Sequence, residues 1–144
     1  MNKDLTQKLA QAAACLLSAI MVWNYGTGLE GTEFSGGRIT GPLLDLYDIG
    51  SVLFVLAVLL TFFLRRIAAA ITILASLLCL PLYLYFTAPG LFRRIFRGPW
   101  AEPLQTNFVW NIWAIMGIFI LTIAASVAFR SLLVSGERKS QNSA

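Results

Sequence analysis

Two carboxylates stand three residues apart near the start of an apolar stretch, at Asp45 and Asp48. A spacing of three puts both side chains on one face of a helix. Paired carboxylates can bind a cation or exchange protons with a substrate. The alternative is structural, because acidic side chains in the first turns of a helix are stabilised by its positive N-terminal end. Since no further ligand is evident beside them, we take the structural interpretation as the default.

Basic and amide side chains elsewhere in the chain could join this pair. Arg93 and Arg94 lie in a later loop, and Asn111 lies near the start of the last apolar stretch. If the chain crosses a membrane four times, as argued below, these residues reach the same side of it as the carboxylates. We therefore predict a candidate ligand site at the outer membrane interface, formed by Asp45, Asp48, Arg93, Arg94 and Asn111.

The residue types that most often carry catalysis are scarce. The chain has no histidine, which is the commonest metal ligand and the default general base at neutral pH. Its two cysteines, Cys15 and Cys79, do not form a CxxC pair, so we expect each to act as a small buried side chain. We predict no catalytic residue, no metal and no cofactor. An enzyme acting on lipid headgroups would need the interfacial carboxylates and arginines at least, and it ranks last among our hypotheses.

The composition is that of a membrane protein. Of 144 residues, 58% are hydrophobic and only 12% are charged, whereas soluble domains carry about 25% charged residues. A net charge of +4 would suit a nucleic-acid ligand, but the basic residues flank apolar runs, as membrane-flanking charges do. We therefore expect the lipid bilayer as a partner, and no nucleic acid.

Four apolar runs are each close to the about 20 residues that a helix needs to cross the hydrocarbon core. Only Arg65 and Arg66 separate the second run from the third. One continuous helix would be about 65 Å long and would leave both arginines deep in lipid, so we predict a tight helical hairpin. The fold class expected is all-α, an integral membrane four-helix bundle in a single domain over residues 1–134. The expected helices are about 9–25, 43–64, 67–88 and 108–129.

The first run could also be read as a cleaved signal peptide, because it follows a basic start. The residues after it, Trp23-Asn24-Tyr25, do not form a small-x-small cleavage site. We therefore expect this helix to be retained.

Positive charge predicts the orientation, because short cytoplasmic loops are enriched in Lys and Arg. With both termini inside (N-in/C-in), seven basic residues fall on the cytoplasmic side and four on the outer side. The inner set is Lys3, Lys8, Arg65, Arg66, Arg130, Arg138 and Lys139, and the outer set is Arg38, Arg93, Arg94 and Arg97. We expect a multi-pass protein of a bacterial cytoplasmic (inner) membrane.

The same topology places every tryptophan and tyrosine toward the outer side, where their rings are expected to anchor the interface. It also places Cys15 about 9–10 Å and Cys79 about 18 Å from the inner boundary, too different in depth for a disulfide. In the third loop, apolar and basic residues alternate around Arg93 and Arg94, which predicts a short amphipathic interfacial helix. Residues 135–144 are polar, and we expect a disordered cytoplasmic tail.

Small residues recur every four positions on three of the expected helices, which favours close helix packing. These faces are Ala10, Ala14 and Ser18, then Ala68, Thr72 and Ser76, then Ala124 and Ala128. Our first hypothesis is a non-enzymatic accessory or interaction subunit, with a membrane-protein partner or as a homo-oligomer. The alternative is a small carrier or lipid-binding protein that uses the outer-interface site.

Overall fold

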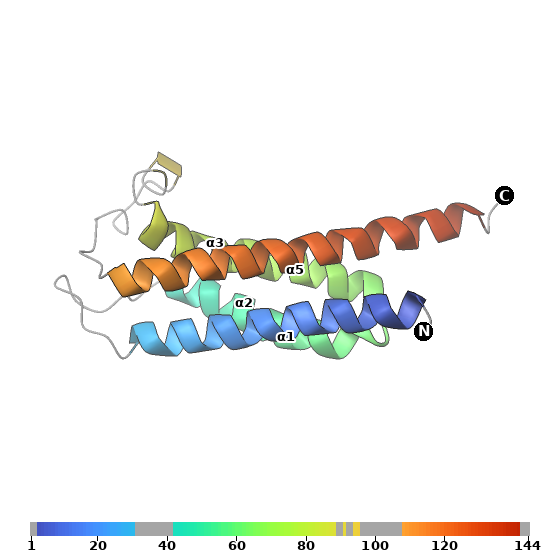
Figure 1. The fold of residues 1–144 in the computed structure, drawn as a ribbon, viewed down its shortest axis with the longest axis horizontal. Coiled ribbons are helices and arrows are strands. Elements are labelled where there is room, and N and C mark those ends of the chain that lie inside the picture. The colour runs from blue at the N-terminus through green and yellow to red at the C-terminus, as the bar shows by residue number, and fades with distance from the viewer. Residues whose placement is uncertain (1–2, 31–41, 89–90, 92–93, 96–107, 142–144) are drawn as a thin grey trace.

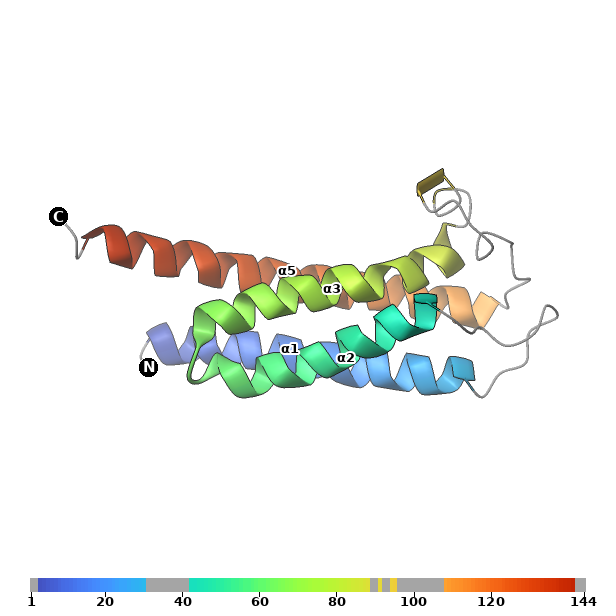
Figure 2. The ribbon, with the colours of Figure 1, turned by 180° about the vertical axis from the view of Figure 1, so that it is seen from behind.

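The computed structural model describes residues 3–30, 42–88, 91, 94–95 and 108–141, and the described part contains helices and no strand. Four long helices pack in the cyclic order α1, α2, α3, α5 (Figures 1 and 2). Both termini and the α2–α3 turn lie at one end of the bundle, called here the terminal end. The opposite end is called the loop end. The helices are α1 (Lys3–Glu30), α2 (Pro42–Thr61), α3 (Arg65–Thr87) and α5 (Phe108–Gln141).

All four helices are long and apolar enough to span a membrane. The candidate spans are Asp4–Thr27, Leu43–Thr61, Arg65–Thr87 and Ile112–Val134. Large apolar side chains such as Val52, Leu59 and Phe119 point outward on these spans. An outer surface of this kind is unfavourable in water and favourable in lipid, which indicates an integral membrane protein.

The predicted tight hairpin between the second and third helices is confirmed, but the turn lies at residues 62–64, and Arg65 and Arg66 begin α3 instead of forming the connection. Leu64 leaves helical geometry, with φ −127° and ψ 59°. Its N–H still bonds the carbonyl of Leu60 at 2.7 Å, and its carbonyl accepts from Ala68 N–H at 2.9 Å. The turn occupies residues 62–64 and contains neither glycine nor proline, and Leu64 departs from helical geometry where the chain reverses.

The helices at the two ends of the chain are longer than their apolar runs. The first begins at Lys3 rather than near residue 9, and an ion pair between Asp4 and Lys8 at 3.2 Å supports its opening turn. Helix α5 continues to Gln141, so most of the expected disordered tail 135–144 has a helical backbone. Hydropathy marks the part of a helix that lies in lipid, whereas a helix already nucleated there extends into polar residues at little cost.

The interior changes character along the bundle. Its loop-end half is aromatic, with buried Tyr25, Tyr47, Tyr83 and Phe86. Its terminal-end half is built from small and polar side chains, which let helix backbones approach closely. Buried residues of this half are Gln11, Ala12, Cys15, Ala57, Thr61, Ala68, Ala69, Thr72, Ala124, Ala128 and Ser131.

The small-residue faces predicted on the third and fourth spans are confirmed as packing faces, since Ala68, Thr72, Ser76, Ala124 and Ala128 are buried. On α1 the face is shifted, because Ala10 is exposed while Ser18 is buried.

Candidate functional site

The residues of the predicted outer-interface site are only partly described. Asp45 and Asp48 lie near the start of α2 at the loop end, with exposed side chains. Arg94 is helical and exposed, whereas Arg93 and the side chain of Asn111 lie outside the described residues. No group of three His, Cys, Asp or Glu side chains that could hold a metal ion occurs in the described ranges. The five-residue site therefore stays a prediction.

The predicted interfacial helix stays a prediction as well. Leu91, Arg94 and Ile95 have helical conformation and exposed side chains. The rest of that segment lies outside the part that the structure describes.

Three tyrosines behave differently from the prediction. Tyr25, Tyr47 and Tyr83 do not face the interface but turn inward and are buried between the helices. The hydroxyls of Tyr47 and Tyr83 lie 2.6 Å apart and bond each other, so both can leave water. The Tyr25 ring lies 5.0 Å from the Tyr83 ring and meets Phe86 edge-on at 6.0 Å. We call these four residues the tyrosine cluster.

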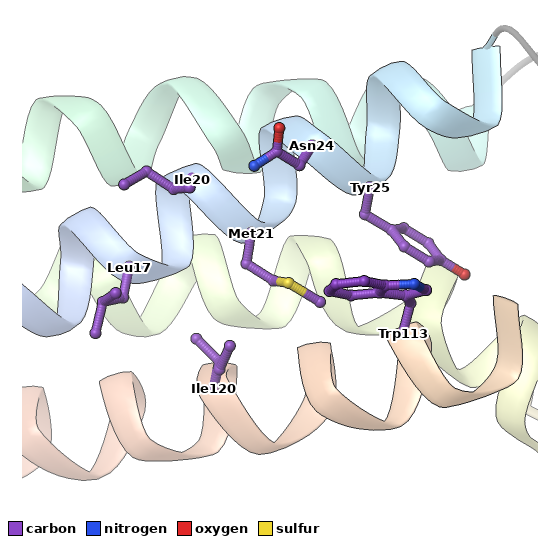
Figure 3. Close-up of a pocket in the computed structure, with 7 residues that line it drawn as sticks. All are labelled: Leu17, Ile20, Met21, Asn24, Tyr25, Trp113 and Ile120. Carbon is purple, nitrogen blue, oxygen red and sulfur yellow. The ribbon is translucent and has the colours of Figure 1, made fainter. Parts of the chain in front are cut away.

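A lateral groove lies between α1 and α5, and Tyr25 of the tyrosine cluster is one of the residues that line it (Figure 3). On α1 its residues recur at helical spacing along one face, and on α5 they lie two turns apart. Met21 and Tyr25 are buried and form the floor, whereas Leu17 and Trp113 are exposed at the rim. The groove has a volume of about 470 Å³. It is lined by Leu17, Ile20, Met21, Asn24, Tyr25, Trp113 and Ile120.

The groove is aliphatic toward the terminal end and aromatic toward the loop end, with one amide at its rim. Leu17 and Ile120 form the part nearer the terminal end, and Trp113 and Tyr25 lie together nearer the loop end (Figure 3). Asn24 stands at the rim with its amide turned away from α5. No hydrogen bond joins that amide to another residue within the described helices. A molecule with an apolar chain and a polar end matches this gradient.

Two further grooves flank other helix pairs. The one between α1 and α2, of about 350 Å³, shares Ile20 and Asn24 with the first. The one between α3 and α5, of about 390 Å³, contains the hydroxyls of Thr122 and Ser126. Each of these hydroxyls donates to a carbonyl of its own helix, at 2.8 Å and 2.7 Å. Their single hydrogens are therefore used. Ser76 also lines this groove, and its hydroxyl donates to the carbonyl of Thr72 at 2.9 Å, so none of the three hydroxyls has a free hydrogen.

A group of polar side chains at the terminal end joins three helices. The Arg65 guanidinium bonds the Asp4 carboxylate at 3.0 Å, the Gln7 amide oxygen at 2.7 Å and the Ser131 hydroxyl at 3.3 Å. We call these four residues the arginine clasp. The sequence placed Arg65 among headgroups and did not suggest these partners. The only local signal was the spacing of Asp4 and Gln7, which puts them on one face of α1.

The cysteines agree with the prediction of separate buried thiols. Both are free and buried. Cys15 lies 3.1 Å from the Thr72 hydroxyl, and Cys79 donates to the carbonyl of Tyr47 at 3.7 Å. They pack in different halves of the interior, as their sequence positions indicated.

Comparison with family models, with curated proteins and with solved structures gives no match for this chain.

Proposed function

We propose that this protein binds a membrane lipid, with the lipid tail in the lateral groove between α1 and α5. The observation that carries the proposal is the gradient of that groove, from aliphatic side chains near the terminal end to the Trp113 indole and Tyr25 near the loop end. Because the loop end lies at a membrane interface, a lipid can place its polar end there and its tail along Leu17 and Ile120.

The size of the groove favours a chain-shaped ligand. A volume of about 470 Å³ falls within the ~300–1,000 Å³ of small-molecule sites. A transmembrane helix with its side chains is about 10–12 Å wide and would rest on the rim rather than enter. Groups that could contact the headgroup include the predicted set at the outer interface, with Asp45 and Asp48 on α2.

Filling the groove from its rim tests this proposal. Leu17 is 60% exposed, so Leu17→Trp adds bulk to the groove without forcing a large side chain into the core. We expect lipid retained by the purified protein, measured by native mass spectrometry in mild detergent, to fall about tenfold, equal to ~1.4 kcal/mol of binding free energy. The matched control is Leu16→Trp, one residue away and 51% exposed, which lines the α1–α2 groove instead.

The control variant should keep its lipid. Equal retention by both variants, or no lipid on the wild type, would contradict the proposal. In the same assay, Asp45→Asn with Asp48→Asn reports whether these carboxylates select the headgroup.

A role as an accessory subunit is the second candidate, and one observation favours it. The Asn24 amide is exposed on a membrane-spanning helix, where an unpaired amide favours association with another helix. The preparation used for lipid analysis separates the two functions. A second polypeptide or a second copy retained in fixed proportion by the wild type, and lost in Asn24→Leu, would support the subunit.

We propose an N-in/C-in orientation in a bacterial inner membrane for the lipid-binding protein. Its support is the charge distribution, with Lys8, Arg65, Arg66 and Arg130 at the terminal end. A green fluorescent protein fused after Ala144 should therefore fluoresce, and an alkaline phosphatase fused there should be inactive. Active phosphatase with a dark fluorescent fusion would reverse the orientation.

A further inference from the structure

A buried amide in the terminal-end half has no partner among the described residues. Gln11 is 1% exposed, and neither its Nε2 nor its Oε1 makes a hydrogen bond within the described helices. The Nε of Arg65 is likewise buried and makes no hydrogen bond to any residue that the structure describes. Leaving a buried donor or acceptor unpaired costs about 1–3 kcal/mol, so a natural protein rarely keeps three such atoms without a partner for them.

The position of Gln11 connects two polar groups. It follows Gln7, which bonds Arg65, by one helical turn, and it precedes Cys15, which contacts Thr72, by one turn. Side chains four residues apart on a helix are neighbours. The Gln11 amide therefore lies between the arginine clasp and the Cys15–Thr72 pair, in the half of the interior where side chains are small.

The hydrogens of the Cys15–Thr72 pair are already assigned. The Thr72 hydroxyl donates its one hydrogen to the carbonyl of Ala68 at 2.8 Å. The Cys15 thiol must then be the donor in the 3.1 Å contact with Thr72. Neither hydrogen is left for Gln11 Oε1. The missing partner must accept from an amide N–H, donate to an amide oxygen, and fit among small side chains.

We propose that ordered water binds at Gln11 in the terminal-end half of the bundle and bridges its amide toward the Nε of Arg65. A water molecule both donates and accepts, and buried waters in proteins typically make about three hydrogen bonds to such groups. The terminal-end half is then hydrated, whereas the loop-end half is dry because the tyrosine cluster fills it.

The two native cysteines report this difference. Both side chains are 0% exposed, so static burial predicts equally slow exchange of their hydrogens with solvent. A water molecule at Gln11 predicts instead that the Cys15 thiol exchanges its hydrogen with solvent faster than the Cys79 thiol does. The measurement is infrared spectroscopy of the full chain in phosphatidylcholine vesicles moved into D2O. It follows the conversion of each S–H band to S–D, with Cys15→Ser and Cys79→Ser used to assign the bands.

We expect Cys15 to exchange at least about tenfold faster than Cys79. Gln11→Leu removes the amide and fills its place. In this variant the S–H exchange rate of Cys15 should fall to that of Cys79, and the exchange rate of Cys79 should not change. Equal rates in the wild type, or a Cys15 rate unaffected by Gln11→Leu, would overturn the proposal.

Circular dichroism melts confirm that the variant is folded. If Gln11→Leu fails to fold, Gln11→Met provides an unbranched apolar replacement of similar length, and the same two outcomes apply to it.

Discussion

Replacing Gly117 by alanine is expected to lower the free energy of unfolding by about 2 kcal/mol. A methyl group at Gly117 would overlap the ring of Tyr83, which cannot move away because Tyr25 and Tyr47 pack against it. Overpacking of a filled core costs about 1–3 kcal/mol. The sign of this change in unfolding free energy distinguishes a crowded site from an open one, because replacing glycine by alanine inside an unobstructed helix stabilises the protein by about 1 kcal/mol.

Thermal unfolding in detergent, followed by circular dichroism, measures this effect. Gly26→Ala is the matched control, because its new methyl would lie 3.1 Å from the Tyr47 ring, a contact that a small shift relieves. In a Tyr83→Leu background the penalty at Gly117 should disappear. A Gly117→Ala protein as stable as the wild type would mean that α3 and α5 are not in close contact at the tyrosine cluster.

Loss of the arginine clasp is expected to have the second large effect. Arg65→Ala removes bonds to Asp4, Gln7 and Ser131, and thereby separates α3 from α1 and α5 at the terminal end. The Arg65 side chain is only 13% exposed, so water replaces these bonds poorly. We expect a loss of about 2 kcal/mol, below the ~3–5 kcal/mol of a fully orphaned buried charge, because Asp4 keeps its ion pair with Lys8.

The neighbouring arginine provides the control. Arg66 is exposed, and Arg66→Ala should change stability by no more than about 0.5 kcal/mol in the same unfolding assay. Arg65→Lys should be intermediate, because an ammonium keeps the charge and loses the planar fork that reaches three partners. If the Arg65 and Arg66 variants unfold alike, the clasp does not hold the terminal end together.

Both predictions follow from the difference in packing between the two halves of the bundle interior. In the loop-end half, large rings fill the space between helices, and glycine is required where a backbone meets a ring. In the terminal-end half, the helices are close and polar side chains join them. A hydrated terminal-end half and a lateral lipid groove beside the tyrosine cluster can coexist, because the first lies inside the bundle and the second opens on its surface.

Hydropathy in the sequence was enough to predict four membrane helices, a tight hairpin between the second and the third, and two separate buried cysteines. The physical reason is that these features depend on local composition: an apolar run of sufficient length must span lipid, and two arginines cannot lie in the middle of it.

The direction in which each side chain faces was decided only by the tertiary structure. Tyr47 and Tyr83 could bury their hydroxyls because each supplies the other's partner, 36 residues away in the chain. The partners of Arg65 on α1 and α5 are likewise more than 50 residues distant. A groove between α1 and α5 exists only when the ends of the chain come together, so no local pattern could have revealed it.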